Sequence, residues 1–226
     1  ITLKGGEVIN KEQHSCSNGT SIKIKNLFFN IPARRKFLKS DNVEMRHISE
    51  EFNRIALAYP ACNMQFFHNK KEILFLRENN FRQRIVNVIG LKSNEYLVPV
   101  NEETSLVNLS GFVCKPEYAK KTRGEQYIFV NNRFIKNYHI QSAISKAFEG
   151  LISENHFPSY FINLKVDAKS IDINIHPTKT EIKFEDEKSI YAIIRSAVRK
   201  SLGQYNISPS IDFIQENALD VKNLDI

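Results

Sequence analysis

The second half of the chain alternates strand patterns with helical patterns, and this order restricts the possible folds more than any other feature of the sequence. Apolar runs at Tyr127–Val130 and Arg133–Ile135 flank Asn131-Asn132, a pair of residues that tolerates positive φ and therefore suits a hairpin turn. Four more elements are predicted after the hairpin: a helix at 137–151, strands near 160–166 and 171–175, and a helix ending at Gly203. Strand pairs and helices intermixed in this order predict a two-layer α+β domain.

The first part of the chain gives shorter patterns. Ile22 and Ile24 alternate with polar residues and predict a half-buried strand that runs into Phe29. A helix is predicted to end at Pro60, because apolar residues recur along one helical stripe: Met45, Ile48, Phe52, Ile55 and Tyr59. Four elements are predicted after it: a hairpin with its turn at 68–71, a short helix ending at Gly90, and strands near 97–100 and 106–114.

Changes in composition suggest how the chain is divided. Residues 77–81 are polar and show no periodic signal, and the segment 211–226 holds four acidic residues against one lysine. We therefore predict three parts, at 1–78, 79–203 and 204–226, the last being the start of an acidic linker. The first residue is Ile1 rather than Met, so we expect this chain to be a piece of a longer protein.

The overall charge is positive, since 32 Lys and Arg face 25 Asp and Glu and give a net charge of +7. A basic protein of this kind suits an anionic partner or ligand. Cys16, Cys62 and Cys114 lie far apart without a C-x-x-C pair, which favours a reducing, cytoplasmic location and neither a disulfide framework nor a zinc site. No apolar run reaches the length of a membrane span, and no secretory signal is recognisable.

Two segments contain residues that suit a phosphate ligand. Gly19 allows a close backbone approach and the hydroxyl of Thr20 can bond a phosphate oxygen, although such a pair alone is weak. Lys179 follows Pro177 in a short loop, where its ammonium group could reach a terminal phosphate. Taken by pattern alone, an exposed hairpin lysine is the simpler interpretation. The basic run Pro32–Lys36 can likewise be a solvated loop.

A third candidate is the basic stretch from Lys115 to Lys146. Seven cations stand there against Glu117 and Glu125, which leaves a local charge of +5. Such an excess is typical of a surface that binds the DNA backbone, and a solvated face is an equally good interpretation. The cations that we predict to contact DNA are Lys120, Lys121, Arg123, Arg133 and Lys136. The sequence contains no recognisable catalytic or P-loop motif.

Three blocks in this order, L-F-F-N-I-P-A-R-R-K-F-L, F-V-N-N-R-F-I and N-I-H-P-T-K-T-E-I-K-F, closely resemble the MutL family of DNA mismatch repair proteins over residues 19–202. The resemblance implies the C-terminal part of a GHKL ATPase sandwich, followed by a transducer domain like domain 2 of ribosomal protein S5. It also implies that Gly19 and Thr20 belong to the last nucleotide-binding motif and that Lys179 contacts the γ-phosphate of ATP. The residues that bind most of the ATP and Mg²⁺ would precede Ile1, so we expect no ATP turnover by this chain alone.

The family resemblance also implies a role for the longer protein. Its members are ATP-dependent matchmakers that form homodimers, bind DNA and couple a mismatch-recognition protein of the MutS type to a downstream nuclease or helicase. Two alternatives remain at this point. One is a non-enzymatic nucleic-acid-binding module, which would not require Lys179. The other is the transducer of a type II topoisomerase B subunit, from which the P-A-R-R-K-F-L block points away.

Overall fold

The computed structural model describes residues 1–173 and 180–207, and for residues 206 and 207 only the backbone. Two compact units are distinguished, at Ile1–Glu51 and Phe52–Ile226. The boundary between these units lies within a helix and coincides with neither of the predicted boundaries. The predicted division into 1–78, 79–203 and 204–226 stays a prediction.

The first unit contains little regular structure. Strands β1 (Thr2–Lys4) and β2 (Glu7–Asn10) pair as a small hairpin, and the basic run forms a short helix, α1 (Pro32–Lys36), with its proline in the first turn. The strand predicted around Ile22 and Ile24 is absent, and both side chains are exposed. A strand forms only where a second strand accepts its hydrogen bonds, and no described segment pairs with this one. The prediction was wrong because an alternating pattern of apolar and polar residues does not show whether a second strand is present to pair with it.

Helix α2 (Asp41–Ala58) ends as predicted just before Pro60. Its buried residues are Ala56, Leu57 and Ala58, whereas Ile48 and Ile55 of the predicted stripe are exposed. The ring of Phe52 stacks on that of Phe66 at 4.8 Å, which joins the end of the helix to the next hairpin. The helix itself was therefore predicted correctly, and its buried face only in part.

The predicted hairpin is confirmed as β3 (Met64–His68) and β4 (Lys71–Leu76), joined by two residues with positive φ, Asn69 and Lys70. Helix α3 (Phe81–Ile89) follows. Asn80 caps its start by accepting a hydrogen bond from the amide of Gln83, and Gly90 ends it with φ of 122°. A short 3₁₀ helix, η1 (Leu91–Glu95), leads into the main sheet.

The main sheet has five strands in the order β5-β6-β9-β7-β8. Their bounds are β5 (Leu97–Glu103), β6 (Asn108–Cys114), β7 (Gln126–Val130), β8 (Arg133–Phe134) and β9 (Tyr160–Lys165). All neighbours are antiparallel except β7 and β9, which run parallel and sit side by side although helix α4 (Tyr138–Ala147) separates them in sequence. The predicted turn at Asn131-Asn132 is confirmed, since both residues have positive φ. Strand β8 forms one edge of the sheet.

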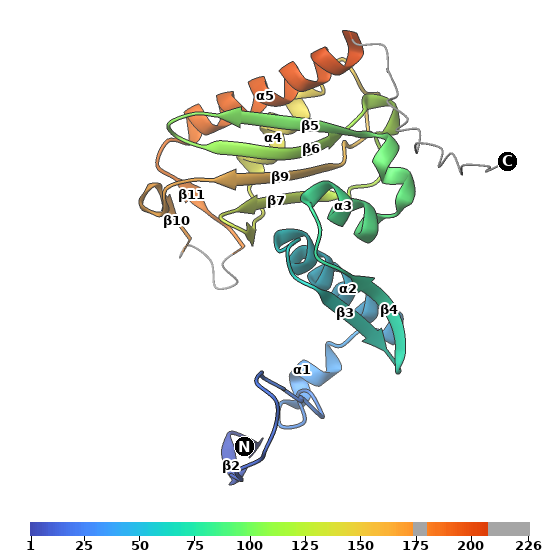
Figure 1. Cartoon of the computed structure of the whole chain (residues 1–226), viewed down its shortest axis with the longest axis vertical. Coiled ribbons are helices and arrows are strands. Elements are labelled where there is room, and N and C mark those ends of the chain that lie inside the picture. Colours follow the sequence, from blue (N-terminus) through green and yellow to red (C-terminus); the bar gives the residue numbers. More distant parts are fainter. Residues whose placement is uncertain (174–179, 208–226) are drawn as a thin grey trace, which may run out of the picture. The chain divides into compact units, whose positions relative to one another are not determined.

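Helices cover both faces of this sheet. Figure 1 shows α4 and α5 (Glu187–Ile207) against one face and α3 against the other. Lys200 of α5 forms an ion pair with Glu102 of β5, and the ring of Phe81 in α3 lies 6.1 Å from that of Phe112 in β6. The core between sheet and helices is continuous and includes Ile128, Ile162, Ile144 and Val198. The predicted α+β class is confirmed.

Three small elements remain among the described residues: two 3₁₀ turns, η2 (Pro116–Tyr118) and η3 (Ala168–Ser170), and a ladder of β10 (Ile171–Asp172) with β11 (Lys183–Phe184). Helix α5 does not end at Gly203 as predicted. A glycine inside a helix costs only about 1 kcal/mol, and burial of neighbouring side chains offsets that cost. Leu202 is fully buried, and the ammonium group of Lys115 lies 4.7 Å from the ring centre of Tyr205, beyond the glycine.

Candidate nucleic-acid interface

The expected nucleotide contacts are only partly within the described structure. Gly19 and Thr20 lie exposed in the first unit, and Gly19 has φ of 151° with open space where a side chain would stand. Lys179 lies outside the described residues. One exposed hydroxyl and one glycine do not form a nucleotide pocket by themselves. Among the described residues, no three His, Cys, Asp or Glu side chains come together as a group that could hold a metal ion.

The cations of the basic stretch occupy two places in the second unit. Arg133 is exposed on the edge strand β8, and Lys136 is exposed between β8 and α4. The chain is held there by backbone bonds, because the amide of Ile135 donates to Ile128 and that of Lys136 donates to Thr180 at 2.6 Å. Lys120, Lys121 and Arg123 are exposed in the loop that precedes β7. An edge strand with an outward cation is protected from pairing with another chain and can face a polyanion.

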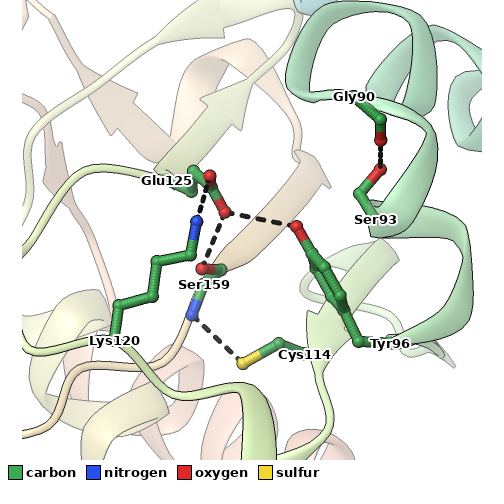
Figure 2. A network of polar contacts seen from close by, with 7 residues as sticks. All are labelled: Gly90, Ser93, Tyr96, Cys114, Lys120, Glu125 and Ser159. Atoms are coloured by element: carbon green, nitrogen blue, oxygen red, sulfur yellow. Dashed lines mark hydrogen bonds and ion pairs between the residues drawn. The ribbon is translucent and has the colours of Figure 1, made fainter.

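Lys120 differs from the other four because it takes part in a network of polar contacts (Figure 2). Its ammonium group forms an ion pair with the carboxylate of Glu125. The same carboxylate accepts a hydrogen bond from the hydroxyl of Ser159 at 3.0 Å and a longer one, at 3.5 Å, from that of Tyr96. The Lys120 charge is therefore compensated within the protein.

The network continues through Ser159 to the end of β6. The Ser159 amide donates to the sulfur of Cys114 at 3.2 Å, and the Cys114 amide donates back to the carbonyl oxygen of Ser159 at 2.9 Å. Burial, with a smaller contribution from Glu125, raises the pKa of Tyr96 to about 12. Burial also raises the pKa of the Cys114 thiol to about 11. Both groups therefore stay neutral at physiological pH. Their hydrogen bonds hold the end of β6 against the segment that leads into β9.

Arg123 packs against an aromatic side chain instead of an acid. Its guanidinium carbon lies 4.6 Å from the ring centre of Phe157. A guanidinium group stacked in this way is held in place while its N–H groups stay available to a phosphate. Lys121, Arg133 and Lys136 form no ion pair with any residue that the structure describes. Four exposed cations thus have no carboxylate partner among the described residues. Glu125 distinguishes Lys120 from these four, and the sequence by itself had shown Glu125 only as one negative charge in the basic stretch.

A search against protein families matches residues 85–203 to the model described as "DNA mismatch repair protein, C-terminal domain". No helix within the described ranges has the length and apolar character required to cross a bilayer.

The chain is also similar to curated proteins that are named DNA mismatch repair protein MutL. The identity is 55% for the protein of Christiangramia forsetii, 52% for that of Flavobacterium johnsoniae and 45% for that of Bacteroides fragilis. These alignments cover 97%, 97% and 98% of this chain, and 36%, 34% and 35% of the relatives. The chain therefore spans about a third of the length of the curated relatives that it matches.

Two solved structures have the same fold. The N-terminal domain of a DNA repair protein aligns with a TM-score of 0.67 and 18% identity, covering 80% of this chain and 60% of that one. The ATPase domain of Aquifex aeolicus MutL, solved with ADP, aligns with a TM-score of 0.51 and 20% identity, covering 76% and 55%. At this level of identity the two comparisons establish the fold alone.

Proposed function

Since the chain belongs to the MutL family of DNA mismatch repair proteins, we propose that it is the part of an ATP-dependent matchmaker that binds DNA and transmits the nucleotide state. The observation that carries this proposal is the set of four exposed cations without a carboxylate partner, Lys121, Arg123, Arg133 and Lys136. They would contact phosphates and not bases, so binding would be independent of sequence and sensitive to salt.

In this proposal most of the ATP and Mg²⁺ site is built by residues outside this chain. Gly19 and Thr20 would form one edge of that site, and Lys179 would contact the γ-phosphate. A lysine that bridges from the transducer to a bound nucleotide would couple the nucleotide state to the relative orientation of the domains. The longer protein would act in the cytoplasm as a homodimer, together with a mismatch-recognition protein and a nuclease or helicase.

The DNA contact is tested by charge reversal in the full-length protein. Arg133→Glu combined with Lys136→Glu should weaken binding to a DNA duplex and flatten the dependence of affinity on salt, because fewer counterions are released. Lys92→Glu combined with Arg195→Glu is the matched control, since these exposed cations lie on η1 and α5 and the net charge changes equally. If both pairs give the same salt slope as the unchanged protein, Arg133 and Lys136 do not contact DNA.

The nucleotide contact is tested separately with Lys179→Ala in the full-length protein. Steady-state ATP hydrolysis should fall strongly, because a charge-assisted bond to the terminal phosphate would be lost. Lys183→Ala, on strand β11, serves as the control for a nearby exposed lysine. Unchanged turnover in Lys179→Ala would remove this residue from the site and leave the DNA proposal unaffected.

A further inference from the structure

The residues that follow Lys179 in the chain are bonded to the start of helix α4 at two consecutive positions. The backbone amide of Lys136 donates to the carbonyl oxygen of Thr180, and the side-chain amide of Asn137 donates to that of Ile182 at 3.1 Å. Lys179 itself lies outside the described residues, and Thr180 and Ile182 are the first and third residues after it. The segment that leaves Lys179 is therefore attached to α4.

This attachment is shielded from water. Asn137 is 8% exposed and Ile182 is 3% exposed, and Ile182 belongs to the same core as Ile140 and Ile144 of α4. A buried carbonyl group that loses its donor finds no water to replace it, so the loss costs more than at an exposed site. The bond from Asn137 to Ile182 therefore restricts where the segment after Lys179 can lie.

The side chain of Asn137 makes two different contacts at once. Its oxygen accepts a hydrogen bond of 3.0 Å from the amide of Ile140 and caps α4, while its nitrogen donates to Ile182. Capping a helix requires only an acceptor, which Asp or Ser supplies as well as Asn does. Asn80 caps α3 in the same way, by accepting from Gln83 at 2.9 Å. The donor contact of Asn137 is thus additional to its role as a cap.

We propose that Asn137 is a positioning residue for ATP hydrolysis in the longer protein. By holding the carbonyl group of Ile182 it fixes the segment that follows Lys179, and so the place from which the lysine reaches the terminal phosphate. The inference rests on the nucleotide contact of Lys179 proposed above and adds a second residue to it. Asn137 does not touch the nucleotide. It acts through Lys179, because a displacement of about 1 Å in a group that contacts the reacting phosphate lowers the rate strongly.

The experiment measures steady-state ATP hydrolysis by the full-length protein. Asn137→Asp keeps the oxygen that caps α4 and removes the donor to Ile182. Asn137→Ser also keeps a cap, is too short to reach Ile182, and is neutral, so it excludes an effect of the added charge. Both variants should lower kcat about tenfold and leave the KM for ATP unchanged.

Asn80→Asp and Asn80→Ser are the matched controls, because the same changes are made at the cap of α3. They should leave kcat unchanged. Melting temperatures measured in parallel establish that every variant is folded at the assay temperature. A loss of kcat in the Asn80 variants as large as in the Asn137 variants would overturn the inference, and so would unchanged kcat in both Asn137 variants.

A double-mutant cycle tests whether Asn137 acts through Lys179. In a protein that already carries Lys179→Ala, adding Asn137→Asp should cause no further loss of kcat, because the group that Asn137 positions has been removed. A further tenfold loss in the double variant would overturn the inference, since it would mean that Asn137 affects the reaction by another route.

Hydrogen exchange tests the attachment without ATP. The amide of Lys136 donates to Thr180, so its exchange, followed by mass spectrometry of the peptide that contains it, should become several-fold faster in the Asn137 variants and stay unchanged in the Asn80 variants. Unchanged exchange in the Asn137 variants would overturn the inference. If exchange becomes faster while Lys179→Ala keeps full turnover, the attachment by Asn137 stands and the proposed nucleotide contact of Lys179 fails.

Discussion

The guanidinium group of Arg84 donates a hydrogen bond of 2.6 Å to the backbone carbonyl oxygen of Cys62. The same nitrogen also lies 2.7 Å from the carbonyl oxygen of Pro60 and 3.1 Å from that of Arg77. Arg84 is fully buried in α3, and the three carbonyl groups belong to the segments that surround the β3–β4 hairpin. One cation thus holds the end of α2, the hairpin and α3 together within the second unit.

Replacing Arg84 by Met should destabilise this unit by about 2–4 kcal/mol, because three buried carbonyl groups lose their donor while the aliphatic volume is largely kept. Thermal unfolding measures the effect. Lys92→Met is the control, since Lys92 is an exposed cation on η1 whose side chain forms no hydrogen bond or ion pair with the described residues. A change below about 1 kcal/mol for Arg84→Met would mean that water replaces the guanidinium group.

Gly111 and Gly203 should respond in opposite directions to replacement by Ala. A Cβ atom on Gly111 would lie 2.1 Å from the carbonyl oxygen of Phe161, and the backbone there has φ of 144°. Because the contacted atom belongs to the backbone of β9, Gly111→Ala should cost about 2–4 kcal/mol.

Gly203→Ala provides the matched comparison. Nothing lies within 4 Å of a Cβ atom there, and the residue is inside helix α5. This substitution should stabilise the protein by up to about 1 kcal/mol. Both variants are compared by thermal unfolding, and a loss of stability in Gly203→Ala would indicate that the helix does not continue through this residue in solution.

The stability of the protein should decrease in alkali because of Tyr96. Its pKa is raised to about 12 in the folded protein, whereas an unfolded tyrosine titrates near about 10. The contribution of the neutral hydroxyl is fully present below about pH 10 and is lost as the pH rises from there towards 12. Tyr96→Phe should therefore flatten the fall of the melting temperature in this range.

Tyr118→Phe is the control for Tyr96→Phe, because the Tyr118 ring lies 5.1 Å from that of Tyr96 and is 41% exposed. Ionisation of the Cys114 thiol should cause a similar loss of stability at a lower pH, since the pKa of this thiol rises from 9.0 to about 11 on folding. A melting profile of Tyr96→Phe that matches the unchanged protein above about pH 10 would contradict the assignment to Tyr96.

Lys120 and Lys121 are adjacent and should contribute unequally to DNA binding. Lys121→Ala should reduce the salt dependence of duplex affinity by about 1 in slope, because one phosphate contact is lost. Lys120→Ala should change it much less, since the Lys120 charge is paired with Glu125. Fluorescence anisotropy across a salt series measures both slopes.

Glu125→Gln extends the same test. It keeps the size of the side chain and removes its charge, so Lys120 would become available to phosphate and the salt dependence should increase. Equal slopes for Lys120→Ala and Lys121→Ala would show that the ion pair opens when DNA binds.

Sequence patterns predicted correctly the features that depend on residues close together along the chain, and failed where the interacting residues are far apart in sequence. The turn at Asn131-Asn132 and the end of α3 at Gly90 depend on neighbours within a few residues, so the sequence predicts them directly. The strand expected at Ile22 required a partner elsewhere, and none is found among the described segments. Gly203 could not mark the end of α5 because packing of Tyr205 decides where that helix continues.

By itself, the amino-acid sequence determined the family and the α+β class, and it supplied the cations that we propose to face DNA, because these depend on residue type, short-range periodicity and motif order. Only the tertiary structure decided which of the cations is compensated by a carboxylate. Glu125 meets Ser159 and Tyr96 across separations of 34 and 29 residues, and Tyr160 lies beside Gln126 through the parallel pairing of β7 with β9. Contacts between such distant residues depend on how the sheet is ordered, and the order of strands is not encoded in any local pattern.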